Sequence, residues 1–198
     1  AVRAETPWAD VDDHAALEPA LVDGLVEHDG RVLRFAHPIY ARAALDIARA
    51  VNDLMDAHGR MPVATDVGDC LFTAMDFVQT DHVAPGYYAT MGYGVPAGLG
   101  VQAASGRRPL VLVGDGAFQM TGPEISHAPR NGVAPIVVLV NNRGWQIFRP
   151  VSPRPDLLAV PPWPYAELAQ AWGGVGIQAE TRTARQQPVL GITLQHLR

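Results

Sequence analysis

The stretch that decides the fold is Pro109-Leu-Val-Leu-Val-Gly-Asp-Gly-Ala117, in which a short apolar run ends at a glycine-rich turn. A second apolar run, residues 135–140, ends at a pair of asparagines. Valine-rich runs of this length are typical of strands buried on both faces of a parallel sheet. Between them, Thr121 and Glu124 have the spacing of a capping box, which predicts a helix start. The order strand, turn, helix, strand predicts an α/β fold, with a parallel sheet flanked by helices.

Polar side chains directly follow both predicted strands: Asp115 the first and Asn142 the second. Because the carboxyl ends of parallel strands meet at one edge, we expect these side chains to lie together there, with the amides of the 114–117 turn facing an anion. A carboxylate, an amide and a backbone carbonyl suit Mg²⁺ better than Zn²⁺. Taken separately, the glycines indicate a tight turn and the asparagines a loop. Together, at this spacing, they favour a diphosphate group held through Mg²⁺.

Composition excludes several classes of function. The chain has 198 residues, 48% of them hydrophobic and 18% charged, which is enough to bury the core of one domain. A formal charge of -5 without a basic run argues against nucleic acid or an anionic membrane as a partner. The single cysteine excludes an internal disulfide and fits a reducing compartment. We therefore expect a soluble, cytoplasmic protein.

The remaining segments predict further helices and strands around this unit. Asp29-Gly30 separates two short apolar runs and suits a hairpin, and six prolines make residues 149–164 an irregular loop. Pro129 is expected to kink or end the helix after the glycine turn. Apolar spacing predicts helices at 43–57, 95–104 and 165–172, a strand at 61–65, and a loop at Asp69 that runs into a helix.

Several of these motifs resemble those of a known family. Residues 114–124 and 141–144 resemble the thiamine diphosphate signature. Residues 66–75, 84–88 and 91–98 are similar to the 2-oxo acid decarboxylases, most of all to the phenylpyruvate and indolepyruvate decarboxylases. The likeness is dense from Ala44 to Gly174. It implies the C-terminal, diphosphate-binding domain of such an enzyme, with thiamine diphosphate and Mg²⁺ as cofactors and a 2-oxo acid as substrate.

The resemblance also implies roles for individual residues. The metal ligands are Asp115, Asn142 and the carbonyl of Gly144. The cofactor contacts are the turn residues Gly114, Asp115, Gly116 and Ala117, the loop residues Asp69 and Cys70, the pyrimidine-edge residues Ala89 and Met91, and Asn142, Gly144 and the apolar Ile147. Among these, Met91 matches the residue that holds the cofactor in its bent form. Without the family, Met91 is read as a core methionine and Asp69 as a turn residue or helix cap.

The same resemblance shows what this sequence lacks. In the family, the glutamate that activates the cofactor belongs to a separate pyrimidine-binding domain, and nothing in residues 1–38 resembles it. The paired histidines of that domain are absent too, and His82 and His127 are expected to be non-catalytic. We therefore assign no catalytic residue. We expect half of an active site, inactive alone, completed in an oligomer by another chain or by lost N-terminal sequence.

Two further expectations concern substrate and domain organisation. Phe148 stands where pyruvate-type members keep a glutamate, which favours an aryl-pyruvate substrate. We expect residues 1–38 to be a linker or the remnant of a preceding domain, 39–180 the thiamine diphosphate-binding domain, and 181–198 an unmatched, truncated C-terminus. Two alternatives stay open: a non-catalytic remnant of such an enzyme, or a carboligating component similar to acetolactate synthase.

Overall fold

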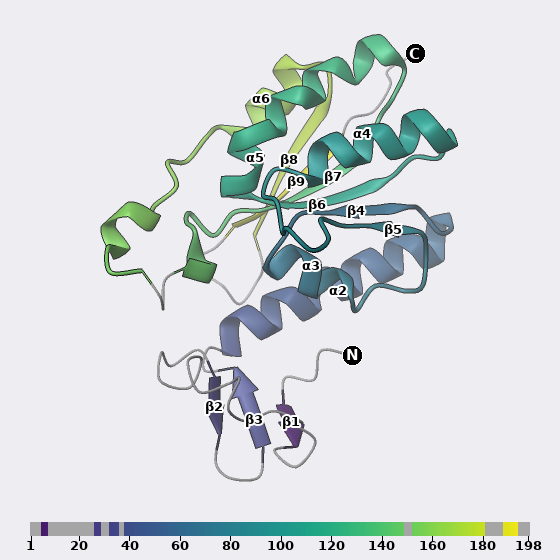
Figure 1. Cartoon of the computed structure of the whole chain (residues 1–198). Helices are drawn as coiled ribbons and strands as arrows, with labels where there is room; N and C mark the ends of the chain where they lie inside the picture. The colour runs from purple at the N-terminus through teal and green to yellow at the C-terminus, as the bar shows by residue number, and fades with distance from the viewer. Residues whose placement is uncertain are drawn as a thin grey trace.

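The computed structural model of the chain is built on one six-stranded sheet, and it describes residues 5–7, 26–28, 32–35, 38–148, 152–180 and 188–193 (Figure 1). Four neighbouring strands run parallel, and two further strands are added at one side, the first of them antiparallel to the four and the second antiparallel to the first. The order across the sheet is β5 (His82–Val83), β4 (Val63–Thr65), β6 (Leu110–Gly114), β7 (Ile136–Val140), β9 (Pro188–Thr193) and β8 (Val175–Glu180). The α/β fold with a parallel sheet is therefore confirmed.

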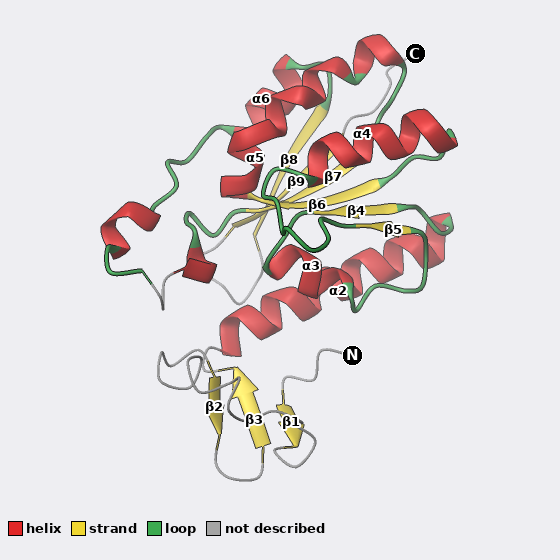
Figure 2. Cartoon of the chain, viewed as in Figure 1, coloured by secondary structure: helices red, strands yellow, loops and turns green. Residues whose placement is uncertain are grey.

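Helices cover both faces of this sheet (Figure 2). One face carries α2 (Pro38–His58) and α3 (Asp69–Ala74), and the other carries α4 (Gly94–Ser105), α5 (Asp115–Thr121) and α6 (Tyr165–Ala171). The side chains of β6 alternate between the two layers. Leu110 and Leu112 pack towards α2 and α3, whereas Val111 and Val113 pack in the other core cluster.

The neighbouring strand β7 is less covered than the sequence predicts. Val137 and Leu139 are buried, but the side chains that alternate with them are only partly buried. The core cluster on that face is formed mainly by α2, α3, β4 and β6, and Val138 and Val140 lie at its margin. The prediction of burial on both faces is therefore correct for β6 and wrong for β7.

The predicted amphipathic helix at 43–57 is confirmed as α2, which is longer at both ends. Its apolar stripe contributes Ile47, Val51 and Met55 to the core. Ion pairs lie along its surface: Arg49 pairs with Asp46 at 3.7 Å within α2, and Arg60, just beyond the end of the helix, pairs with Asp56 at 3.1 Å. Within the described ranges, no helix combines the length and apolar character needed to cross a membrane.

The capping box predicted at Thr121 is only partly right: Thr121 is the N-cap of the short 3-10 helix Gly122–His127, but its side chain makes no capping bond. The helix α5 begins at Asp115, directly after the turn glycine, and it ends at Thr121. The Thr121 hydroxyl donates to the carbonyl oxygen of Gly92 at 2.7 Å instead of capping a helix. Two short 3-10 helices, Gly122–His127 and Pro129–Asn131, then lead to β7. The α-helix thus ends before Pro129, as predicted from the N–H that proline lacks.

The N-terminal strands form a separate small sheet of β1 (Glu5–Pro7), β3 (Val32–Phe35) and β2 (Val26–His28). Antiparallel pairing of β2 with β3 confirms the predicted hairpin around Asp29-Gly30, although the turn itself lies outside the described residues. In the segment 181–198, where no family strand was expected, residues 188–193 form β9 between β7 and β8.

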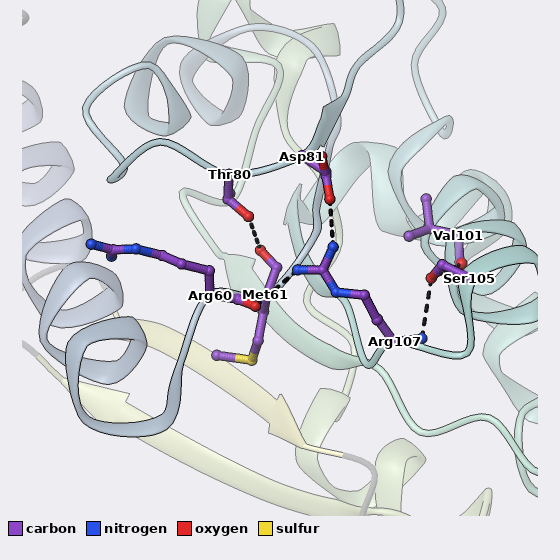
Figure 3. Close-up of polar contacts among 7 residues, drawn as sticks. All are labelled: Arg60, Met61, Thr80, Asp81, Val101, Ser105 and Arg107. Carbon is purple, nitrogen blue, oxygen red and sulfur yellow. Dashed lines mark hydrogen bonds and ion pairs between the residues drawn. The ribbon is translucent and has the colours of Figure 1, made fainter.

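A polar cluster holds the amino ends of three parallel strands together (Figure 3). The Arg107 guanidinium, before β6, pairs with Asp81, before β5, and donates to the carbonyl of Arg60, before β4, at 3.0 Å. The Thr80 hydroxyl donates to the carbonyl of Met61 at 2.7 Å. Since the Arg107–Asp81 pair is solvent-exposed, its contribution is about 0–1 kcal/mol. The cluster lies at the amino ends of the strands, so it does not occupy the carboxyl edge, where ligands bind to open parallel sheets.

Helix α4 offers a test of the packing because it contains two glycines in different surroundings. A Cβ atom at Gly98 would lie 2.3 Å from Cγ2 of the buried, β-branched Val111, whereas one at Gly100 would have nothing within 4 Å. We expect Gly98→Ala to destabilise the fold by about 1–3 kcal/mol through overpacking. Gly100→Ala should stabilise it by about 0.5–1 kcal/mol through helix propensity. Urea unfolding of both variants checks this, and shifts of the same sign would contradict the packing of α4 on β6.

Candidate functional site

Three polar residues follow three neighbouring parallel strands at the carboxyl edge of the sheet. Asp66 follows β4, Asp115 follows β6 and Asn142 lies two residues after β7. The register that pairs Gly114 with Val140 places the ends of β6 and β7 side by side. The carboxyl edge of an open parallel sheet is the usual place for a ligand.

Asp115 is buried with half of its carboxylate unsatisfied. It is 2% exposed, and its Oδ1 accepts the N–H of Gly116 at 2.8 Å. In the described part of the chain, its Oδ2 is the only buried side-chain oxygen or nitrogen without a hydrogen-bond partner. Burial raises the pKa of this carboxyl, and the Gly116 N–H opposes part of the rise. The N–H groups of Arg143 and Gly144 also face the carboxylate and oppose the rise of its pKa, although their hydrogen bonds go to the side chains of Asn141 and Asn142. A buried acceptor in this state fits a bound cation.

The turn after β7 lies against Asp115. The Asn142 side chain accepts the N–H of Gly144 at 3.1 Å, and Arg143 has a left-handed φ of 58°. A bridge between Gly144 and Ala159 ties this turn to the proline-rich segment. A Cβ at Gly144 would lie 2.8 Å from the carbonyl oxygen of Leu158, so only glycine fits there. The structure thus brings Asp115 and the 142–144 turn together.

An indole ring covers the glycine turn. A Cβ atom at Gly116 would lie 2.7–2.9 Å from three ring carbons of Trp145. The backbone of Trp145 is itself fixed, since its N–H donates to the carbonyl of Leu158 at 2.8 Å. The sequence analysis assigned no role to Trp145, because nothing in its spacing indicates a contact with a residue 29 positions earlier.

The Asp69 loop approaches the same edge. Gly68, with φ of 70°, precedes α3, and a Cβ there would lie 3.6 Å from Cδ1 of the exposed Ile147. Asp69 is exposed, but the Cys70 thiol packs inside the core. Burial raises the pKa of this thiol well above its usual range, and nearby carboxylates, among them Asp115, raise it further. Cys70 can therefore meet a ligand only through its main chain.

The Met91 turn, residues 89–94, completes the edge. Ala89 is exposed with a left-handed φ of 50°, and Met91 is partly buried against the core. Met91 is therefore neither a fully buried core methionine nor a free surface residue. Four large apolar side chains that neighbour the Met91 turn and the 142–144 turn along the chain are exposed: Tyr87, Tyr88, Ile147 and Phe148.

The two histidines considered in the sequence interact with residues other than Asp115. The His82 ring is 3.1 Å from the Thr65 hydroxyl, and partial burial lowers its pKa. His127 lies 3.6 Å from Glu124 in a surface pair. Neither contacts a residue of the glycine turn through any of these interactions.

A family model decides what this edge belongs to. The model described as "Thiamine pyrophosphate enzyme, C-terminal TPP binding domain" matches residues 66–196. The chain belongs to this family. The match includes β9, and it begins at Asp66, the first of the three polar residues at the sheet edge.

Known relatives of this thiamine pyrophosphate-binding domain are decarboxylases. The chain is 46% identical over 181 residues to an indole-3-pyruvate decarboxylase of Azospirillum brasilense. The aligned region covers 85% of this chain and 33% of that protein. It is 35% identical over 91 residues to an alpha-keto-acid decarboxylase of Mycobacterium tuberculosis, 43% of this chain and 16% of that protein. A probable pyruvate decarboxylase of Schizosaccharomyces pombe is 29% identical over 154 residues, which are 72% of this chain and 25% of that protein. The chain thus spans about a third or less of each relative. Its resemblance to the C-terminal domain of a 2-oxo acid decarboxylase is confirmed.

The residues present fit the cofactor of this family, which is thiamine diphosphate (thiamine pyrophosphate) with Mg²⁺ as the usual metal. The orphaned Oδ2 of Asp115 supplies a negative oxygen, and the neighbouring turn supplies amide and carbonyl groups. Such an oxygen-only set suits a hard ion.

Proposed function

We propose that this chain binds Mg²⁺ and thiamine diphosphate at the carboxyl edge of its sheet and forms the C-terminal part of an aryl-pyruvate decarboxylase. The observation that carries the proposal is the buried Asp115 carboxylate with one oxygen unpaired beside the 142–144 turn. Without a cation, an unsatisfied buried carboxylate only costs stability. The relatives named as decarboxylases of indole-3-pyruvate and alpha-keto acids support the reaction class.

Each proposed site residue then has a distinct task. Asp115, the Asn142 side chain and the Gly144 carbonyl hold the metal, and the main chain of residues 114–117 orients the diphosphate from the start of α5. The loop at Asp69 and Cys70 contributes main-chain contacts from the neighbouring strand end. Thiamine diphosphate, when bound, supplies the group that accepts the electrons left by carbon dioxide.

The other half of the site orients the organic part of the cofactor and the substrate. Met91 supports the bent cofactor, with the Ala89 carbonyl and the Met91 amide at the pyrimidine edge. Ile147 flanks the cofactor, and its exposed neighbour Phe148 favours a large apolar 2-oxo acid over pyruvate.

Catalysis requires a pyrimidine-binding domain in addition to this one. We propose that another chain, or sequence outside these 198 residues, supplies the activating carboxylate, and that the working form is an oligomer in the cytoplasm. The exposed Tyr87, Tyr88 and Phe148 support an apolar interface near the site.

Isothermal titration calorimetry tests the proposed function. We expect thiamine diphosphate to bind the chain in the presence of Mg²⁺ and not in the presence of EDTA, because the phosphates and Asp115 need a cation between them. The same titration applies to the site variant Asp115→Asn, for which Asp53→Asn is the matched control. Asp53→Asn removes an exposed carboxylate from α2 and should bind like the wild type.

Equal binding with and without Mg²⁺ would contradict the proposed metal site, and no binding under either condition would favour a non-catalytic remnant. The same samples should release no aldehyde from phenylpyruvate. Aldehyde released by the purified chain alone would overturn the need for a second domain.

A further inference from the structure

The Met91 turn contains one residue, Ala89, in a backbone conformation that its side chain does not favour. Ala89 has φ of 50° and Gly92 has φ of 82°, both in the left-handed region. For a residue with a Cβ atom, such as Ala89, this conformation persists only where the surrounding structure enforces it. The contacts that hold this turn are therefore informative about how Met91 is placed.

Asp66 holds the turn from the end of β4. Its side chain is 0% exposed, and its two carboxylate oxygens accept three backbone N–H groups. Oδ1 accepts from Val67 and Gly92, each at 3.1 Å, and Oδ2 accepts from Gly94 at 2.8 Å. Two of the three donors thus lie one and three residues after Met91, and Gly94 is also the first residue of α4.

Thr121 holds the same turn from the end of α5. Its hydroxyl donates to the Gly92 carbonyl at 2.7 Å, so both polar groups of Gly92 are engaged, one from each side. The fit is close: a Cβ at Gly92 would lie 3.1 Å from the Thr121 methyl. The helix α5 begins at Asp115, so this bond joins the Met91 turn to the element that carries the proposed metal ligand.

We propose that Asp66 and Thr121 are positioning residues that fix the Met91 turn relative to α5 and so align the pyrimidine half of the cofactor site with its diphosphate half. This inference rests on the proposed function above. Neither side chain is proposed to touch the cofactor. Both act through the main chain of Gly92 and Gly94, whose geometry determines where Ala89 and Met91 point.

Two ligands separate the halves of the site. Thiamine diphosphate uses both halves, whereas inorganic pyrophosphate with Mg²⁺ uses only the diphosphate half. A positioning role therefore predicts weaker binding of thiamine diphosphate with unchanged binding of pyrophosphate. A general loss of structure would weaken both ligands together.

The main variant is Asp66→Asn, which preserves shape but replaces one acceptor oxygen by an NH₂ donor. Either orientation of the amide leaves a donor facing the N–H of Gly92 or Gly94, so a buried bond is lost. We expect thiamine diphosphate affinity to fall on the order of tenfold or more, and pyrophosphate affinity to stay within about twofold.

A matched pair at Thr121 keeps the test decisive if Asp66→Asn folds poorly. Thr121→Val removes the hydroxyl at nearly constant shape and should weaken thiamine diphosphate on the order of fivefold. Thr121→Ser retains the donor to Gly92 and should restore binding to within about twofold of the wild type. Hydrogen exchange of residues 89–94 in the ligand-free chain should be faster in the valine variant than in the serine variant.

The outcomes separate this inference from the proposed function. If the wild type binds both ligands and neither Asp66→Asn nor Thr121→Val selectively weakens thiamine diphosphate, the positioning role is overturned. Equal losses for the two ligands also overturn it. If the wild type binds neither ligand, the proposed function fails. In that case the exchange data still decide whether Thr121 fixes the turn, and equal exchange in the valine and serine variants would refute it.

Discussion

Asp115→Asn should abolish Mg²⁺-dependent binding of thiamine diphosphate and, in the ligand-free chain at neutral pH, raise the stability of the fold. The substitution removes the charge that the cation requires, and the expected loss of affinity is on the order of 100-fold or more. It also removes a buried carboxylate with an unpaired oxygen, while Asn can still accept the Gly116 N–H through its own oxygen. Calorimetry measures the first effect and urea unfolding the second.

The stability effect of Asp115→Asn should depend on pH in a defined direction. Burial raises the pKa of Asp115 in the folded state above its usual value of 3.8. The folded chain therefore binds more protons than the unfolded chain between these two pKa values, and stability falls as pH rises through that interval. The advantage of Asn should be absent below the usual pKa and fully present above the raised one. Urea unfolding of both proteins at acidic and at neutral pH checks this prediction, and an equal stability advantage of Asn at both pH values would contradict it. Added Mg²⁺ should stabilise only the wild type.

Gly116→Ala should greatly weaken cofactor binding because the added methyl collides with Trp145. A Cβ there would lie 2.7 Å from the indole ring of Trp145, a residue whose backbone N–H is held by the Leu158 carbonyl in the loop that also carries Asn142 and Gly144. We expect an affinity loss on the order of 10- to 100-fold, measured by calorimetry. Gly100→Ala in α4 is the matched control, since it adds the same methyl outside the proposed site, where a Cβ has nothing within 4 Å.

A second substitution tests whether the collision is the cause. Trp145→Leu removes the six-membered ring that a methyl at position 116 would meet. The double variant Gly116→Ala, Trp145→Leu should therefore bind more tightly than Gly116→Ala alone. If the double variant binds no better, the methyl acts directly on the ligand rather than through Trp145.

The sequence predicted those features that depend on local pattern. The alternation of Leu110 and Val111 between two core layers, the apolar stripe of α2 and the hairpin at Asp29-Gly30 follow from periodicities that neighbouring residues determine. The meeting of Asp115 with the turn after β7 follows from the rule that parallel strands end at one edge.

Features that depend on distant residues were missed or misread. Thr121 has the spacing of a capping box, but its hydroxyl bonds Gly92, 29 residues earlier, so tertiary packing overrides the local signal. The place of Trp145 over Gly116 depends on a bridge to the proline-rich segment. Asp66 could have been found, because it is a carboxylate directly after a strand, as Asp115 is.

The position of β9 between β7 and β8 has a consequence for synthesis of the chain on the ribosome. Strand β8 is translated before β9 but pairs with the sheet only through it. The strands that carry the proposed site, β4, β6 and β7, are contiguous in the sheet and are made earlier. While residues 188–193 are still inside the exit tunnel, β7 therefore presents an open edge, which is a risk for aggregation during translation.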